Sequence, residues 1–233
     1  MVILNNIPFE PNIDSLFKTL RIDKESQDAS DVLNLVETVK PQINPKVIYK
    51  ISYIQNNTID EVVIDGVTFN SRVLHINLNQ VERVFPFIAT CGREADAIEI
   101  PQDDFLTRYW FDTIKGMALD VALKYFRNHL KKKYALRKFA SMSPGSGPHD
   151  TWLIEQQRPL FSLFGNVEEL IGVRLTESFL MIPNKSVSGI CFPTEISFET
   201  CQLCSRENCR GRRAAYDKKL AEITLVQNSI LKK

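Results

Sequence analysis

The chain has 233 residues, of which 44% are hydrophobic, with 29 Lys and Arg against 28 Asp and Glu. This length suffices to bury a sizeable core, and the composition excludes a disordered or fibrous protein. No run approaches ~18 consecutive apolar residues and the N-terminal residues lack the pattern of a secretory signal, so we expect a cytoplasmic protein whose partners include neither membrane nor nucleic acid.

The first part of the chain predicts two helices followed by a strand. Apolar residues recur at spacings of three and four over residues 11–22 and again over 31–39, which is typical of short amphipathic helices. Pro41 ends the second of them. Residues 47–54 alternate with a period of two, which predicts one strand whose common face holds Val47, Tyr49, Ile51 and Tyr53.

A hairpin, a strand and a long helix are expected next. Asp65-Gly66 lies between two apolar runs and supplies the positive φ angles of a tight turn, so residues 62–69 predict a hairpin. Another strand is expected at residues 86–90, and the longest helix at about 104–133. The basic run Lys131–Lys133 suits the negative end of that helix's dipole.

The remaining elements surround a loop rich in proline and glycine. No regular element is expected over residues 140–150, and a loop of this length is often functional. A helix is predicted at 154–164, a helical turn at 166–172, strand structure at 178–192 with a break at Pro183-Asn184, and a last helix ending near 231. This order favours a single α+β domain over residues 1–233, built on a twisted antiparallel sheet.

Charge is divided unevenly along the chain. Residues 1–120 carry 11 basic and 18 acidic side chains, whereas residues 121–233 carry 18 and 10. Either the two halves fold together and form an ordinary dipole, or the C-terminal half presents a basic face to an anionic ligand or partner.

Three of the five cysteines lie within nine residues, inside a cysteine-rich segment that we define as residues 191–213. Cys201, Cys204 and Cys209 have a Cys-x2-Cys-x4-Cys spacing, which leaves three interpretations open: an iron–sulfur cluster, a zinc site, or free thiols and a disulfide. The fourth metal ligand would be Cys191, then Cys91, or His149 for zinc. Neighbouring arginines would lower thiol pKa values or form a solvated face: Arg206, Arg210, Arg212 and Arg213.

One segment carries a family resemblance. Residues 174–189, Arg-Leu-Thr-Glu-Ser-Phe-Leu-Met-Ile-Pro-Asn-Lys-Ser-Val-Ser-Gly, resemble a signature of the activation domain of cobalamin-dependent methionine synthase. Further matches to standalone versions of that domain are Thr90-Cys91-Gly92, Phe111–Ile114, Ser143-Pro144-Gly145 and Gln157–Phe161. The resemblance extends over about residues 45–215.

The resemblance implies a function in methionine biosynthesis. In that family the domain docks on a cobalamin-binding protein, presents S-adenosylmethionine, and supports one-electron reduction and methylation of cob(II)alamin, with a flavodoxin or ferredoxin as a possible electron donor. This chain would be an accessory subunit that positions the reactants, while the cofactor supplies the chemistry. The implied binding residues are Ser143, Pro144, Gly145, Ser146, Gly147, Glu177, Ser188 and Gly189.

The chain also departs from the family pattern. Ser141 stands where the full-length enzyme has a ligand-binding arginine, Ser146 where it has a tyrosine, and Glu199-Thr200 where a pair of tyrosines follows. Arg137 or Lys138 is a candidate replacement for the missing guanidinium. The alternative function is therefore a non-catalytic corrinoid-protein-binding module with a decayed S-adenosylmethionine pocket and a structural metal.

Three further residues have two interpretations each. Glu177 either orients the site loop or caps backbone groups at the end of an element. His149 is either a ligand or an exposed loop side chain. Asp120 is either a buried acid that faces the ligand or an ordinary surface charge on the long helix.

Overall fold

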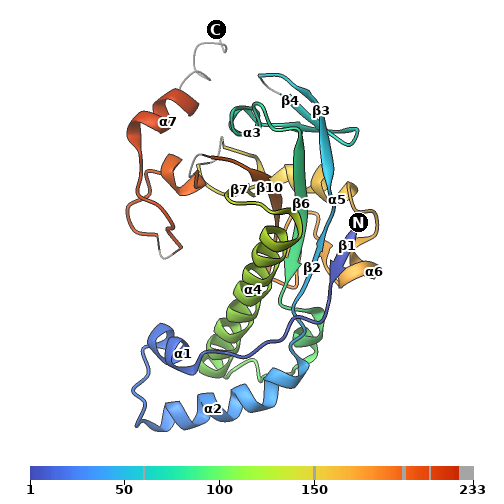
Figure 1. Cartoon of the computed structure of the whole chain (residues 1–233). Coiled ribbons are helices and arrows are strands. Elements are labelled where there is room, and N and C mark those ends of the chain that lie inside the picture. Colours follow the sequence, from blue (N-terminus) through green and yellow to red (C-terminus); the bar gives the residue numbers. More distant parts are fainter. Residues whose placement is uncertain (60, 149–150, 196–197, 210, 226–233) are drawn as a thin grey trace.

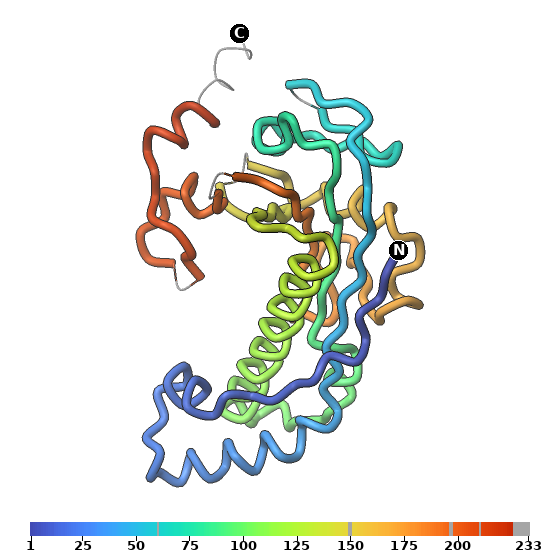
Figure 2. Tube along the Cα trace, in the orientation of Figure 1, coloured from blue at the N-terminus to red at the C-terminus, as the bar shows by residue number. Residues whose placement is uncertain are grey.

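The computed structural model describes residues 1–59, 61–148, 151–195, 198–209 and 211–225. The chain curves into the shape of a C (Figures 1 and 2), with α1 and α2 at one end, α7 at the other, and the long helix α4 along the inside. Among the described residues, no helix combines the length and apolar character that crossing a membrane requires.

The main sheet is antiparallel and centres on β6 (Arg83–Thr90). One edge of β6 pairs with β10 (Ser186–Pro193), which in turn pairs with β7 (Phe139–Met142). Along its other edge, the start of β6 pairs with β3 (Ser52–Asn57) and its end pairs with β2 (Lys46–Tyr49). β1 (Val2–Leu4) pairs with β2. β4 (Glu61–Ile64) pairs with β3 and forms a hairpin with β5 (Val67–Asn70). The predicted α+β class and antiparallel sheet are confirmed.

The hairpin prediction is confirmed and the single strand over residues 47–54 is wrong. Asp65 and Gly66 have φ angles of 48° and 80°, as the tight turn requires. The other segment breaks after Tyr49 into β2 and β3. Tyr49 is fully buried, whereas Ile51 and Tyr53 are exposed, so the apolar alternation continued across a break in the pairing.

Helix α4 (Phe105–Tyr134) confirms the long-helix prediction. Asp104 caps it, its side chain accepting a hydrogen bond from the Thr107 N–H at 3.0 Å, and Ala135 ends it in the left-handed conformation. The second half of the helix packs on the sheet through Ala122, Phe126 and Leu130, against Tyr49, Phe85 and Phe87. We call this side of the sheet the inner face.

The first half of α4 packs against the N-terminal arm. This arm contains α1 (Ile13–Leu20), α2 (Gln27–Val39) and the short 3-10 helices η1 (Lys40–Gln42) and η2 (Arg93–Ala97). Its core joins these elements to the helix through apolar side chains, among them Leu16, Val32, Val36, Trp110 and Ile114. Both predicted helices are confirmed, and the second begins four residues earlier than expected, capped by Ser26.

Short helices cover the opposite, outer face of the sheet. They are α3 (Arg72–Asn77), η3 (Ile154–Gln156), α5 (Gln157–Ser162) and α6 (Val167–Ile171). Successive residues of β10 point to opposite faces of the sheet. Ile190 and Phe192 pack with Trp152 and Leu160 on the outer face, and Cys191 packs on the inner face.

The expected loop over residues 140–150 begins later than predicted, because Phe139–Met142 pair with β10 as β7. The expected strand region 178–192 with its break at Pro183-Asn184 is confirmed: β9 (Met181–Ile182) ends before the break and β10 begins after it. A strand missed in the sequence, β8 (Arg174–Leu175), pairs with β9 in a small hairpin. The chain then forms the 3-10 helix η4 (Thr200–Leu203) and α7 (Lys218–Leu225). The predicted continuation of that helix to 231, His149 and Arg210 lie outside the described residues.

Candidate functional site

The candidate site lies on the inner face, where α4 and β10 run side by side in the same direction. At one end Lys185 Nζ, just before β10, is 2.7 Å from Asp112 Oδ2. At the other end Arg127 is close enough to the buried Cys191 thiol to act on it electrostatically. Between them, a Cβ on Gly116 would be 4.0 Å from Lys185 Cε, the far end of a flexible side chain.

The predicted loop residues meet the predicted strand residue at this face. A Cβ on Gly189 would be 2.4 Å from Met142 O and 2.8 Å from Ser143 Oγ, so only glycine fits where the loop leaves β7. Gly145 has φ +77° and donates its N–H to Trp152 O at 2.8 Å, and Gly147 has φ +93°. The structure therefore brings Ser143 and Gly189 together, whereas Gly145 lies against Ile154 of η3 and Gly147 against Thr200 of η4. The positive φ angles of both loop glycines favour glycine.

Ser188 points to the outer face. It is 1% exposed and donates a hydrogen bond from Oγ to Gln157 Oε1 at 3.1 Å. Gln157 begins α5 and is also buried. This pair ties β10 to α5 behind the loop, which gives Ser188 a positioning contact in place of direct access to the inner face.

Glu177 lies apart from the loop, on the exposed tip of the β8–β9 hairpin. Thr176 closes that tip: its N–H donates to Leu180 O at 2.8 Å, and its Oγ1 accepts from the Leu180 N–H at 3.1 Å. No hydrogen bond or ion pair among the described residues joins Glu177 to the Ser143–Gly147 loop, so the two parts of the predicted binding set stay separate.

A cavity of about 380 Å³, here called the upper cavity, lies beyond Gly189 between α4, β7 and η4. Ser141 and Glu199, which occupy the positions of the family's arginine and tyrosines, both line it, and so does the predicted replacement pair Arg137 and Lys138. Arg127 and Lys131 complete its basic wall, with Phe139, Ala140 and Thr194. Two of the residues that differ from the family pattern therefore line one space, whereas Ser146 and Thr200 are not part of its lining.

Asp120 lies on the same side of α4, two turns beyond Asp112 and two before Arg127. Partial desolvation raises the pKa of its carboxyl group, and the positive charge of Arg127 opposes that rise. The Asp120 side chain is exposed, as the surface-charge interpretation expects. A carboxylate at this position is suited to accept hydrogen bonds from the ammonium group of a ligand bound on this side of α4.

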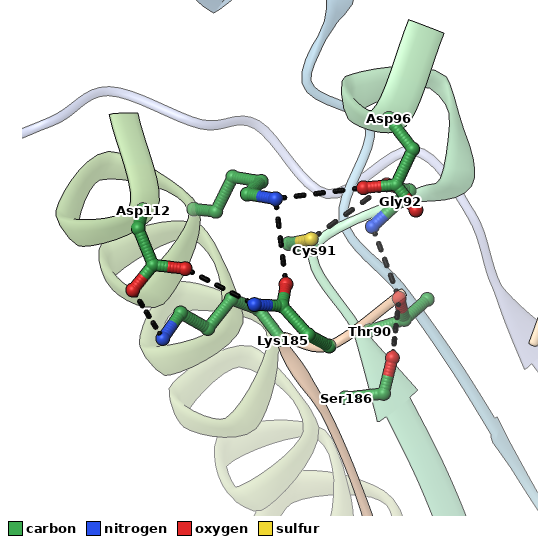
Figure 3. A network of polar contacts seen from close by, with 9 residues as sticks. Thr90, Cys91, Gly92, Asp96, Asp112, Lys185 and Ser186 are labelled. Atoms are coloured by element: carbon green, nitrogen blue, oxygen red, sulfur yellow. Dashed lines mark hydrogen bonds and ion pairs between the residues drawn. The ribbon is translucent and has the colours of Figure 1, made fainter. Parts of the chain in front are cut away.

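A polar network surrounds the ion pair of Asp112 and Lys185 (Figure 3). Asn184 donates to Asp112 Oδ1 at 3.1 Å, and Lys115 donates to Asn184 Oδ1 at 3.3 Å and to Asp96 at 3.5 Å. The neighbouring strands join it: the Cys91 N–H donates to Lys185 O at 2.9 Å. Two segments that resemble the family, 111–114 and 174–189, are thus bonded to each other.

We expect this network to make stability depend on pH. Burial favours the neutral Asp112 carboxyl, but hydrogen bonds from Lys185 and Asn184 and the charges of Lys185 and Lys115 outweigh it and hold its pKa below the usual value. A lowered folded-state pKa stabilises the fold above the unfolded value of ~3.9, and the contribution disappears as the pH falls through the folded value. When the pH is lowered from 7 to ~2.5, the Tm of Asp112→Asn should therefore fall less than the Tm of the wild type.

The measurement is thermal unfolding followed by circular dichroism at both pH values. Asp14→Asn is the matched control, because Asp14 pairs with Lys24 at an exposed position where ion pairs contribute little. Equal pH dependence of the wild type and Asp112→Asn would contradict the assignment.

Comparison with known proteins connects this geometry to a family. Residues 126–210 match the family described as vitamin B12 dependent methionine synthase, activation domain. This chain resembles that activation domain. The crystal structure of the MetH reactivation domain bound to AdoHcy superposes with a TM-score of 0.59 at 17% identity, over 86% of this chain and 81% of that chain, which shows a shared fold. No curated protein matches.

The part that matches the activation domain includes most of the cysteine-rich segment, whose cysteines differ in exposure. Cys201 and Cys204 are partly exposed, Cys209 is exposed, and Cys191 is buried on the inner face. Leu203 of η4 packs with Ile190 and Phe192 on the outer face. Within the described ranges, no three Cys, His, Asp or Glu side chains gather as a metal-binding group, so the metal site stays a prediction.

Arg212 organises the backbone of that segment. Its guanidinium donates to the carbonyl oxygens of Cys201, Cys204 and Ala214 at 3.2–3.3 Å, and to Arg206 O. Burial favours the neutral Cys201 thiol, but hydrogen bonds from Arg213 and the Ala214 N–H outweigh it and lower the thiol pKa. By contrast, burial raises the pKa of Cys191 to about 12 and that of Cys91 to about 11.

Three residues of the candidate site were not predicted as site residues: Asp112 was noted only within a family match, Lys131 only as a charge at the helix end, and Arg127 not at all. Each lies on one stripe of α4 that also contains Gly116 and Asp120, at spacings of four and seven residues. This periodicity was present in the sequence, but nothing there showed that β10 lies beside that stripe.

Proposed function

We propose that this protein supports the reactivation of a cobalamin-dependent methyltransferase of the methionine synthase type. The observation that carries the proposal is the close approach of Gly189 to Ser143 on the inner face, because it joins two segments of the part of the chain that matches the activation domain. The related MetH reactivation domain was crystallised with AdoHcy, which supports S-adenosylmethionine as the ligand here.

The residues on the inner face suit an amino acid attached to a nucleoside. Ser143, which lies beside Gly189, offers a hydroxyl, and Asp120, exposed on α4, offers a carboxylate for the ammonium group. When bound to a partner protein, cobalamin supplies the methyl-acceptor chemistry, and this chain holds the methyl donor in position.

The experiment combines the protein with a cobalamin-binding methyltransferase in the cob(II)alamin state, S-adenosylmethionine and a one-electron donor such as reduced flavodoxin. We expect the absorbance of methylcobalamin to appear only when this protein is present. Asp120→Asn should slow its formation about 10-fold or more, because one charge-assisted hydrogen bond is worth ~1.5–3 kcal/mol. Glu37→Gln, on α2, is the control expected to behave as wild type. Reactivation at the same rate without this protein would refute the proposal.

A second candidate function is a non-catalytic module that binds a corrinoid protein. Ser141 and Ser146 favour it, because they lack the guanidinium and phenol that the family uses for the ligand. Calorimetry separates the two functions: the module predicts no heat with millimolar S-adenosylmethionine, together with retained binding to the cobalamin protein.

For the cysteine-rich segment we propose a metal centre held by Cys201, Cys204 and Cys209, either an iron–sulfur cluster or zinc. Their spacing supports it, and so does the donation of N–H groups to the Cys201 sulfur. Cys191 faces away from η4, so the fourth ligand is expected from another group.

Anaerobic metal analysis tests that centre. An iron–sulfur cluster predicts a brown protein that absorbs at roughly 400 nm, contains several irons per chain and is bleached by Cys→Ala at any of the three positions. Zinc predicts a colourless protein with about one zinc and a lower Tm after chelation. Cys91→Ala is the control, since Cys91 is fully buried at the far end of α4. A protein that contains neither metal would refute the centre.

A further inference from the structure

The upper cavity carries more positive charge than its neighbours neutralise. Its wall contains Arg127, Lys131, Arg137 and Lys138, and within the described part of the chain none of these four forms an ion pair. Glu199 is the single acidic residue of the wall, and its Oε2 lies 3.3 Å from Arg213 Nε. Four cations therefore surround a space whose one lining carboxylate already has a partner, and Asp120, outside the lining, acts electrostatically on Arg127.

The dipole of α4 does not account for this arrangement. Charges interact with a helix dipole within the last turn, which here contains Lys131. Arg127 lies earlier on the helix, is partly buried and acts on the buried Cys191 thiol. Arg137 and Lys138 lie beyond the end of the helix, in the turn before β7. The cations therefore come from the last turns of α4 and from the turn that follows it, and they face one space together.

We propose that the upper cavity binds the phosphate group of a small molecule. Two guanidinium groups can each donate paired hydrogen bonds to phosphate oxygens, and two lysines add point charges. The Ser141 hydroxyl on the same wall supplies a neutral donor. A volume of about 380 Å³ lies at the lower end of the range for small-molecule sites, ~300–1,000 Å³.

The charge count favours phosphate over carboxylate. A carboxylate carries one negative charge, and a single arginine satisfies it, as the family's pattern illustrates. Here four cations face the cavity, so a dianion gains more than a monoanion from the same wall. This inference goes beyond the proposed function, because S-adenosylmethionine contains no phosphate.

Isothermal titration calorimetry with inorganic pyrophosphate, in low-salt buffer and with neither S-adenosylmethionine nor cobalamin, tests the proposal. We expect saturable binding at one site, and at least 10-fold weaker binding of acetate. Arg137→Gln combined with Lys138→Gln should weaken pyrophosphate binding at least 10-fold; both side chains are exposed, so the fold should persist. Arg127→Gln should weaken it further.

Lys124→Gln combined with Lys132→Gln is the matched control, because both residues are exposed on α4 and neither lines the cavity. It removes the same net charge and should leave the affinity within twofold of wild type. The proposal is overturned if the control pair weakens binding as much as the Arg137 and Lys138 pair, or if acetate binds as tightly as pyrophosphate. Circular dichroism of each variant verifies that the fold is intact.

Discussion

Phe126→Ala should lower the free energy of unfolding by about 3–5 kcal/mol, the usual cost of truncating a fully buried aromatic side chain. Phe126 is 0% exposed, and its ring centroid lies 5.4 Å from that of Tyr49 and 5.0 Å from that of Phe87. It therefore joins α4 to both β2 and β6, and its removal leaves a cavity between helix and sheet.

Urea unfolding followed by circular dichroism measures this cost. Tyr125→Ala is the control, since Tyr125 is the neighbouring aromatic residue on α4 and is 43% exposed. It should change stability by less than about 1 kcal/mol. Equal losses of unfolding free energy in the two variants would contradict the inference that Phe126 makes the principal contact between α4 and the sheet.

Gly189→Ala should displace the loop from the inner face. The new Cβ would lie 2.4 Å from Met142 O and 2.8 Å from Ser143 Oγ, so β7 has to move away from β10. Overpacking of this kind costs about 1–3 kcal/mol. We expect S-adenosylmethionine binding, measured by calorimetry, to fall at least 10-fold even where the protein is still fully folded.

Two glycines provide controls for this substitution. Gly211→Ala places its Cβ in open space and should change neither property. Gly116→Ala meets only Lys185 Cε at 4.0 Å, an ordinary contact, and should stabilise α4 by about 0.5–1 kcal/mol. Unchanged ligand binding in Gly189→Ala would separate the loop from the site.

Local sequence signals predicted the elements that local geometry determines. Asp65-Gly66 specified its turn, and Asp104 marked the start of α4. By contrast, β7 was missed because Ala140-Ser141-Met142 carries no strand pattern of its own and is ordered by pairing with β10, about 50 residues later. The break after Tyr49 was missed because Ile51 continues the apolar alternation although it is exposed.

The candidate site was predictable only in part, for the same physical reason. The resemblance selected the loop and Gly189, which do meet. It also selected Ser188, whose side chain lies on the outer face, because two adjacent residues of a strand point in opposite directions. Asp112 and Lys185 are far apart in sequence, so their contact could not be seen before the chain was folded.

Helix α4 also determines how wide the C opens. At ~1.5 Å per residue its 30 residues span roughly 45 Å, with the N-terminal arm packed on its first half and the upper cavity at its last turns. The helix keeps the two ends of the C apart, because bringing them together would require α4 to bend or its packing on the sheet to break (Figure 1). The separation between the N-terminal arm and the upper cavity is therefore fixed by the length of this one helix.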